Sequence, residues 1–326
     1  MMHKAGFVVL ATVAIWPRVA PASTELQIAI LNPDRVPELL RLATPRSELE
    51  REPLSYEHSA PLGSLWKLFM FYYLSEAGTH PPPYVCSGAD IDETFCCSPG
   101  GQIEKDEALA RSCGLFFEPS RLGVDEERWR LRWRQLGLEY KWLTNLTDFR
   151  AEAQVPTLEL LRALAALPRH EASFKELNAA LVGVIVDGTA KSAFRRLGAL
   201  YHVKTFTVAA PSSSSSKHEG GFAGWLSDGR PVWAMGPGSS AIVATRWSEA
   251  LARLALESPK ARETDCVRVH FFDDYPIASL VRLPTEKEVS AGPLTGLFEA
   301  RFVRGTALQF TARGELFAKR TASGRT

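Results

Sequence analysis

The chain has 326 residues, of which 45% are hydrophobic and 23% are charged, and its formal net charge at pH 7 is +1. This composition is that of an ordinary globular protein, and the length allows one large domain or a medium domain with a small one. The nearly balanced charge gives no electrostatic reason to expect nucleic acid or an anionic membrane as a partner, so we expect neither.

The N-terminus has the pattern of a secretory signal peptide. His3 and Lys4 precede an apolar run over residues 6–16, and small residues follow at Ala20 and Ala22. The run is too short to span a bilayer, and no cysteine follows it to carry a lipid. We predict a signal peptide over 1–22, cleaved after Ala22, and a periplasmic or secreted protein with no membrane span after cleavage.

Export changes how the cysteines are interpreted. Four of the five lie close together in the chain and the last is distant: Cys86, Cys96, Cys97, Cys113 and Cys266. In an oxidising compartment they predict one or two disulfides and a leftover thiol, with a connectivity that the sequence does not give. Zinc is the alternative, but this stretch contains no histidine and no C-x-x-C pair, so no metal is predicted.

The first elements after the signal predict a strand and a helix. Apolar residues alternate over 26–31, which predicts a strand, and residues 36–42 are expected to pair with it or to form a short helix. Residues 63–74 predict a mostly buried helix. Residues 78–106 are rich in Gly, Pro and Cys, so we predict a loop region held by disulfides.

Four further helices are predicted in the middle of the chain, over residues 106–117, 125–138, 157–167 and 174–186. In the second, Trp129 and Trp133 recur at the spacing of a core face, and arginines lie between them. The interleaved arginines could indicate nucleic acid or lipid, but a solvated helix with tryptophans inward explains them better.

The chain becomes strand-rich from about residue 200. A strand is predicted over 200–208, a hairpin over 222–235 around Ser227-Asp228-Gly229-Arg230, and a helix over 246–256. Strand, helices, strands and helix in this order predict an α+β fold, an antiparallel sheet flanked by helices with a helical insertion. Residues 264–326 predict a small β-rich C-terminal module.

Ser64-Leu65-Trp66-Lys67 is the stretch with the most chemical content. A serine and a lysine three residues apart share one helical face, so the amine can take the proton of the hydroxyl. The apolar neighbours can bury the pair and lower the pKa of the lysine by the roughly 3 units that a base needs near neutral pH. A second such pair, Ser214 with Lys217, lies in a serine-rich loop and is expected to have no function.

With two further motifs the chain resembles the penicillin-binding proteins and serine β-lactamases. That family has Ser-x-x-Lys, then Ser-x-Asn or a variant, then Lys-Thr-Gly; here Ser112-Cys113-Gly114 and Lys204-Thr205-Phe206-Thr207 follow the first motif. The separations look similar to those of compact members such as class D β-lactamases. The resemblance covers roughly 25–258, and we predict a β-lactamase/transpeptidase-like domain over 23–258. The chain also looks like a branch of exported bacterial proteins known only as a domain of unknown function.

The resemblance implies roles for four catalytic residues. Ser64 would be the acylated nucleophile and Lys67 its general base. Ser112 would relay a proton towards the leaving group. Lys204 would supply the second positive charge and hold the carboxylate of the substrate.

The resemblance also implies the residues around the substrate. Thr205, Phe206, Thr207 and Gly114 would line it, and the backbone N–H groups of Ser64 and Thr207 would form the oxyanion hole. The substrate would be a peptidoglycan peptide, a β-lactam or a related amide, and no metal or organic cofactor is implied.

Two residues depart from the family pattern: Phe206 stands where the family has glycine, and Gly114 where it often has asparagine. A phenylalanine could block the approach of a substrate to the strand or turn it aside. Two functions therefore remain open. One is a periplasmic serine acyl-transferase or hydrolase; the other is a catalytically degenerate relative that binds peptidoglycan or an envelope protein partner. If Ser64, Ser112 and Lys204 do not converge in the fold, the motifs are coincidental.

Overall fold

The computed structural model describes residues 25–186, 188–198, 200–210 and 216–257, and the backbone of five short strands between residues 266 and 320. The predicted signal peptide and its cleavage position lie outside the described residues, as does most of the serine-rich loop.

A six-stranded antiparallel sheet forms the centre of the fold, with strand order β3-β2-β1-β10-β9-β8. Its strands are β1 (Leu26–Leu31), β2 (Pro37–Leu42), β3 (Glu50–Pro53), β8 (Tyr201–Ala209), β9 (His218–Leu226) and β10 (Pro231–Pro237). Residues 37–42 are thus a strand paired with β1 rather than a helix. The predicted hairpin is confirmed, because β9 and β10 pair around Ser227-Asp228-Gly229-Arg230. As β8 is at one end of the sheet, one of its edges is free of strand partners in the described part of the chain.

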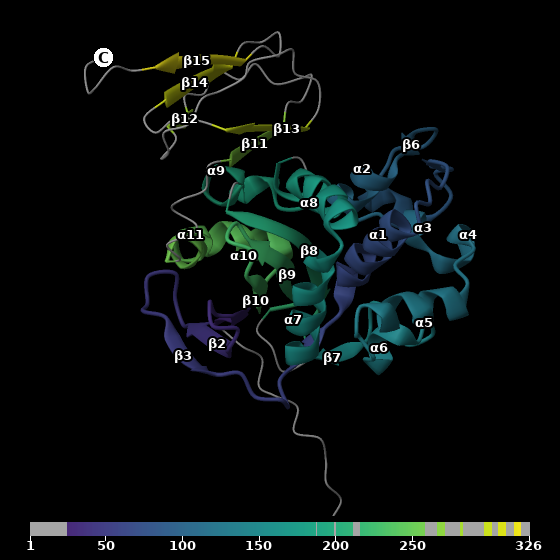
Figure 1. Ribbon diagram of the computed structural model, residues 1–326, viewed down its shortest axis with the longest axis horizontal. Coiled ribbons are helices and arrows are strands. Elements are labelled where there is room, and N and C mark those ends of the chain that lie inside the picture. Colours follow the sequence, from purple (N-terminus) through teal and green to yellow (C-terminus); the bar gives the residue numbers. More distant parts are fainter. Residues whose placement is uncertain are drawn as a thin grey trace, which may run out of the picture.

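Helices cover both faces of this sheet (Figure 1). On one face lie α9 (Phe194–Leu197), α10 (Ser240–Arg246) and α11 (Ser248–Leu256), over a core that includes Ile28 and Phe222. The other face packs on α1 (Trp66–Glu76), α7 (Thr157–Ala166) and α8 (Glu171–Val186), over a core that includes Ala29 and Trp225. These two layers of helices on an antiparallel sheet confirm the predicted α+β fold.

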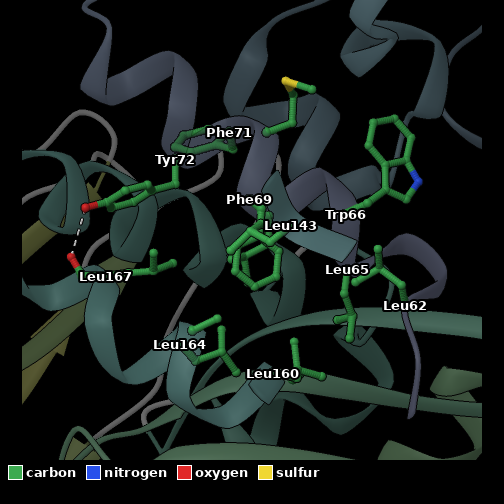
Figure 2. Close-up of a cluster of buried hydrophobic side chains, with 14 of the residues drawn as sticks. Leu62, Leu65, Trp66, Phe69, Phe71, Tyr72, Leu143, Leu160, Leu164 and Leu167 are labelled. Carbon is green, nitrogen blue, oxygen red and sulfur yellow. Dashed lines mark hydrogen bonds between the residues drawn. The ribbon is translucent and has the colours of Figure 1, made fainter. Parts of the chain in front are cut away.

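Helix α1 runs through the middle of the larger core (Figure 2). Its residues from Trp66 to Leu74 are all buried, as expected for a helix that is apolar all round. The hydroxyl of Tyr72 donates to the carbonyl oxygen of Leu167 at 3.1 Å, so the one polar atom of this side chain has a hydrogen-bond partner inside the core. The short turn η1 (Gly63–Leu65) precedes the helix and carries Ser64.

A helical insertion lies between α1 and α7, with α2 (Lys105–Arg111), α3 (Gly114–Phe117), α4 (Pro119–Leu122), α5 (Glu126–Gln135) and α6 (Lys141–Thr144). In α5 the prediction is confirmed: Trp129 and Trp133 are fully buried, and Asp125 caps the helix by accepting from the N–H of Arg128. The predicted helix over 106–117 is instead two helices, because the chain bends at Ser112.

The remaining described elements are short. They comprise the strands β4 (Ser59–Pro61) with β7 (Gln154–Pro156) and β5 (Tyr84–Val85) with β6 (Gln102–Ile103), and the 3-10 turns η2 (Ile91–Phe95), η3 (Leu167–Arg169) and η4 (Lys191–Ala193). Towards the C-terminus, β11 (Cys266–His270) pairs with β13 (Leu297–Arg301), and β14 (Thr306–Phe310) pairs with β12 (Val281–Arg282) and β15 (Leu316–Arg320). The boundaries of a separate module over 264–326 remain a prediction.

Candidate active site

Lys67 connects the first two motifs. Its Nζ lies 3.3 Å from Ser64 Oγ, 3.2 Å from Ser112 Oγ and 2.6 Å from the carbonyl oxygen of Ser112. One amine therefore contacts the hydroxyl groups of two serines that are 48 residues apart in the chain. Both serines are half-buried, so each can still be reached from solvent.

Burial changes the charge state of Lys67. Its side chain is in the core at 8% exposure, and this desolvation lowers its pKa from 10.5 to about 8. The carboxylates of Asp92 and Glu118 oppose the shift, but their effect is smaller. At pH 7 about a tenth of such a lysine is unprotonated, so the amine beside Ser64 can accept a proton.

Ser112 reaches Lys67 because the backbone takes a left-handed conformation there. Its φ is 64° and its ψ is 36°, and it ends helix α2. A residue with a Cβ costs about 1–2 kcal/mol in this region. The bend directs both the carbonyl oxygen and the hydroxyl of Ser112 towards Lys67. Strain of this kind is often found at functional sites.

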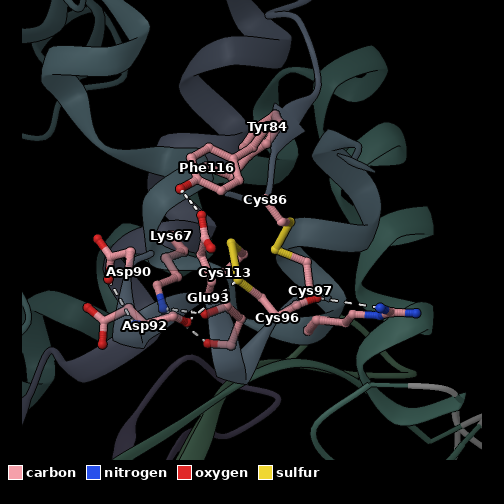
Figure 3. Close-up of a disulfide and its surroundings, with 12 residues drawn as sticks. Lys67, Tyr84, Cys86, Asp90, Asp92, Glu93, Cys96, Cys97, Cys113 and Phe116 are labelled. Atoms are coloured by element: carbon pink, nitrogen blue, oxygen red, sulfur yellow. Dashed lines mark hydrogen bonds between the residues drawn. A yellow bond between two sulfur atoms is a disulfide. The ribbon is translucent and has the colours of Figure 1, made fainter. Parts of the chain in front are cut away.

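Two disulfides hold the segment before this bend (Figure 3). They join Cys86 to Cys97 and Cys96 to Cys113. Two bridges agree with the prediction, and the structure supplies the connectivity that the sequence could not. Because Cys113 follows Ser112 directly, the second bridge ties the second motif to the loop that contains η2.

A buried carboxylate organises the same loop. Glu93 accepts hydrogen bonds from the hydroxyl of Tyr84, the N–H and hydroxyl of Ser87, and the N–H of Gly88. Burial acts to raise the pKa of Glu93, but these donors together hold it below its ordinary value. The loop thus has a fixed shape where it passes the site.

The third motif brings a second lysine to the site. Lys204 is fully buried on β8, and its Nζ donates to the carbonyl oxygen of Thr205 at 3.0 Å and lies 3.5 Å from the Thr205 hydroxyl. Burial, with the positive charge of Lys67 as the second cause, lowers the pKa of Lys204 well below its ordinary value. The turn η1, which carries Ser64, packs against β8, so the third motif lies beside the first. As placed, however, neither Lys204 nor the buried Thr205 can contact a substrate carboxylate directly, which differs from the role expected for them.

The free edge of β8 presents backbone groups next to the first motif. Ser227 N–H donates to Leu200 O, and Ala210 N–H donates to Lys217 O, so the even-numbered residues of β8 form the hydrogen-bonded pairs with β9. Because an antiparallel ladder alternates, the N–H and C=O groups of Thr205 and Thr207 point to the free edge. The turn η1 packs against this strand.

Phe206 is a core residue. Its side chain is 1% exposed, and its ring lies parallel to that of Trp233 with 6.4 Å between the ring centres. We expected this side chain to line the substrate and to hinder or redirect it. The structure instead places it on the buried face of the strand, below the turn that carries Ser64. The phenylalanine therefore does not occupy the solvent-exposed side of the strand, where a substrate would approach.

The other expected substrate-lining residues have mixed placements. A Cβ built on Gly114 would lie 3.6 Å from Nζ of Lys67, so this glycine lies directly beside the amine. Thr207 is exposed, and its hydroxyl accepts from the N–H of Ser240 at 3.0 Å. His202, two residues before Lys204, has its Nδ1 against Oδ1 of Asn178.

One residue near the site had no role in the sequence prediction. Thr189 lies between α8 and η4, 15 residues before Lys204. Its hydroxyl is hydrogen-bonded to the hydroxyl of Thr205, and its N–H donates to the carbonyl oxygen of Ala110. A threonine after a glycine carries no signal of such contacts, because both partners are distant in sequence.

Metal and membrane features were also sought in the described part of the chain. There, no three or more His, Cys, Asp or Glu side chains are grouped so that they could hold a metal ion. Within the same residues, no helix has the length and apolar character needed to cross a bilayer.

Comparison with known proteins finds relatives without an assigned activity. Residues 88–196 match a family model described as "Predicted secreted protein (DUF2300)". The chain is 35% identical over 259 residues to "Uncharacterized protein YfaQ" of Escherichia coli (strain K12). The match covers 79% of this chain but only 46% of that protein, less than half of its length.

The chain also matches solved structures at low sequence identity. A class D β-lactamase from Bacillus subtilis is 10% identical with a TM-score of 0.44, over 72% of this chain and 90% of that one. The C-terminal domain of the Bacillus licheniformis BlaR penicillin-receptor is 13% identical with a TM-score of 0.42, over 72% and 89%. A peptidoglycan synthetase from Bifidobacterium adolescentis is 9% identical with a TM-score of 0.46, over 72% and 56%. At these low values, the case for a reaction depends on the geometry around Ser64.

Proposed function

We propose that this protein is an exported serine acyl-transferase or hydrolase that forms an acyl-enzyme on Ser64 and acts on a peptidoglycan peptide or a related amide. The observation that carries the proposal is the position of Lys67, a buried amine with a lowered pKa between the hydroxyls of Ser64 and Ser112. A lysine placed only for stability has no need of two serine hydroxyls and an unfavourable desolvation.

The first half of the reaction would form the acyl-enzyme. Neutral Lys67 takes the proton of Ser64 Oγ while that oxygen attacks the carbonyl carbon of the substrate. The negative charge that develops on the carbonyl oxygen would be stabilised by the backbone N–H groups of Ser64 and Thr207, the latter at the free edge of β8. The carbon–nitrogen bond then breaks, and the proton reaches the leaving amine through the hydroxyl of Ser112.

The second half would release the acyl group. Water or an amine attacks the ester of Ser64, and Lys67 accepts a proton from the attacking group as it did from the serine. Water gives hydrolysis, and an amine gives transfer. Secretion, which fits the description of the matching family model as a predicted secreted protein, would bring the enzyme to the compartment where peptidoglycan is found.

Covalent labelling tests the proposal. Purified protein is incubated with a fluorescent penicillin and, separately, with a thioester of an acyl-D-alanine, and the intact mass is measured. We expect one acyl group on the wild type and none on Ser64→Ala. Ser214→Ala, which removes the serine of the second Ser-x-x-Lys sequence, is the matched control and should be labelled like the wild type.

Two results would overturn the proposal. One is the absence of an adduct with every donor, and the other is an adduct that persists in Ser64→Ala. If no adduct forms and the protein is retained on purified cell-wall sacculi equally with and without Ser64→Ala, the degenerate binding protein is the better description.

A further inference from the structure

Thr189 lies where the second and third motifs approach each other. Its main-chain N–H donates to the carbonyl oxygen of Ala110 at 3.3 Å, two residues before Ser112. Its side-chain hydroxyl is hydrogen-bonded to the hydroxyl of Thr205, the residue after Lys204. A single half-buried residue thus has one hydrogen bond to the helix end that carries Ser112 and one to the edge strand β8.

The chain around Thr189 is fitted closely to that helix end. Gly188 N–H donates to Gly183 O at 2.7 Å, so the turn after α8 folds back on the helix. A Cβ on Gly188 would lie 2.3 Å from the carbonyl oxygen of Ala110, and a Cβ on Gly183 would lie 3.2 Å from Cβ of Ala110. Two glycines therefore allow the approach that brings Thr189 within reach of α2.

Both partners of Thr189 are in turn bound to the site. Ala110 lies in the last turn of α2, and Ser112, which ends this helix, is contacted by Nζ of Lys67 at its carbonyl oxygen and its hydroxyl. The carbonyl oxygen of Thr205 accepts a hydrogen bond from Nζ of Lys204. The hydrogen bonds of Thr189 therefore close a chain of contacts that runs from Lys67 to Lys204 across the two layers of the fold.

We propose that Thr189 is a positioning residue for the acylation of Ser64, and that it sets the separation between the Ser112 bend and the free edge of β8. The inference rests on the proposed function, since it concerns the rate of that reaction. Thr189 contacts neither Ser64 nor Lys67 directly and acts through Ala110 and Thr205. Displacement of a reacting group by about 1 Å can cost up to roughly 100-fold in rate, so loss of this link is expected to be visible in kinetics.

The experiment compares two substitutions at one position. Thr189→Val keeps the shape and removes the hydroxyl, and Thr189→Ser keeps the hydroxyl. With a thioester donor, we expect Thr189→Val to lower the limiting acylation rate by about 10-fold or more with little change in the half-saturating donor concentration. Thr189→Ser should remain within about 3-fold of the wild type.

A second hydroxyl pair in the same fold supplies the matched control. Ser192 Oγ and Thr245 Oγ1 lie 2.8 Å apart between η4 and α10. Thr245→Val removes this pair on the protein surface and should leave acylation unchanged. The melting temperatures of all variants are measured, and a rate loss at unchanged melting temperature separates positioning from stability.

A readout independent of turnover separates failure of this inference from failure of the proposed function. The titration of Lys67 is followed by NMR of ¹³C-labelled lysine, because burial is the main cause of its lowered pKa of about 8. Thr189→Val keeps the N–H bond to Ala110 but breaks the link between the Ser112 bend and β8. The bend should then move away from β8, admit water and raise this pKa, with Thr189→Ser unchanged. Wild type that forms no adduct overturns the proposed function. Thr189→Val that matches Thr189→Ser in both rate and titration overturns the role of Thr189.

Discussion

Gly63 and Phe206 are complementary across the contact between η1 and β8. A Cβ built on Gly63 would lie 2.9 Å from Cβ of Phe206 and 3.4 Å from its ring, and Gly63 has a φ of +46°. The residue before Ser64 thus has no side chain at the point where the strand has a large one. The phenylalanine in the third motif packs below this turn and is itself only 1% exposed.

This relationship predicts a specific pattern in a double-mutant cycle. Gly63→Ala should lower the free energy of unfolding by about 2 kcal/mol, from backbone strain and the contact with Phe206. Phe206→Gly should cost about 3–5 kcal/mol through the cavity that it leaves. In the double variant the new methyl group would enter that cavity. Its loss in the free energy of unfolding should therefore be smaller than the sum of the two single losses by about 1 kcal/mol or more. Urea denaturation measures all three variants.

Gly78 provides a control that separates the backbone strain of Gly63→Ala from its contact with Phe206. Gly78 has a φ of +59°, and a Cβ there would meet nothing within 4 Å. Gly78→Ala therefore carries the strain alone. If Gly63→Ala costs no more than Gly78→Ala, or if the cycle is additive, Phe206 is not the reason for a glycine at 63.

The lowered pKa of Lys67 predicts the pH dependence of acylation. The neutral amine is the base, so the rate should rise with pH up to about 8 and level off above it. Lys67→Arg keeps a positive charge that does not titrate in this range, so its residual rate should be low and should lack this rise. A wild-type rate that is constant between about pH 6 and 9 would remove Lys67 as the base.

The lowered pKa of Lys67 also predicts that burial of this lysine lowers the free energy of unfolding. Between about pH 8 and 10.5 Lys67 is neutral in the folded protein and protonated in the unfolded chain, so this group makes stability rise with pH across that window. Below pH 8 the whole cost is present, and it corresponds to about 3 kcal/mol. Lys67→Met removes it but leaves the carbonyl of Ser112 without its partner, so we expect a net gain of about 1 kcal/mol at pH 7 that becomes a net loss of about 1 kcal/mol by pH 10, where most of the cost is already gone.

Another buried lysine provides the contrast for this measurement. Lys105 is 9% exposed and is ion-paired with Glu176. Lys105→Met leaves that carboxylate without its cation and should destabilise the protein at pH 7. If Lys67→Met is as destabilising as Lys105→Met, the lysine of the first motif is there for stability rather than for chemistry.

Local patterns in the sequence are sufficient for much of this fold. The helix with Trp129 and Trp133, the strand over residues 26–31 and the hairpin around 227–230 each have periodicity or turn residues within a few positions. The order of the three motifs also predicted that Ser64, Ser112 and Lys204 would converge. These features depend on residues that are near each other in the chain or on a family pattern.

The features that the sequence could not provide depend on distant contacts. Ser112 breaks a helix with a left-handed backbone, for which a serine gives no signal. The buried ring of Phe206 is accommodated by the absence of a side chain at Gly63, and the role of Thr189 depends on its contacts with Ala110 and Thr205. Such pairs become visible only when the two segments are placed side by side.

The two disulfides should differ in their effect on acylation but not on stability. Cys86–Cys97 and Cys96–Cys113 close loops of similar length, with sequence separations of 11 and 17. Removal of either by a pair of Cys→Ala substitutions should therefore cost about 3 kcal/mol in the free energy of unfolding.

Only the second bridge ends next to Ser112, which holds Lys67 through its carbonyl oxygen and hydroxyl. We expect its removal to lower the acylation rate by about 10-fold or more, because the bend is then free to move away from the base. Removal of the first bridge, measured with the same thioester under conditions where both variants are folded, should leave the rate within about 3-fold of the wild type. Equal losses of rate in the two variants would mean that the Cys96–Cys113 bridge supports the fold in general and does not position the second motif.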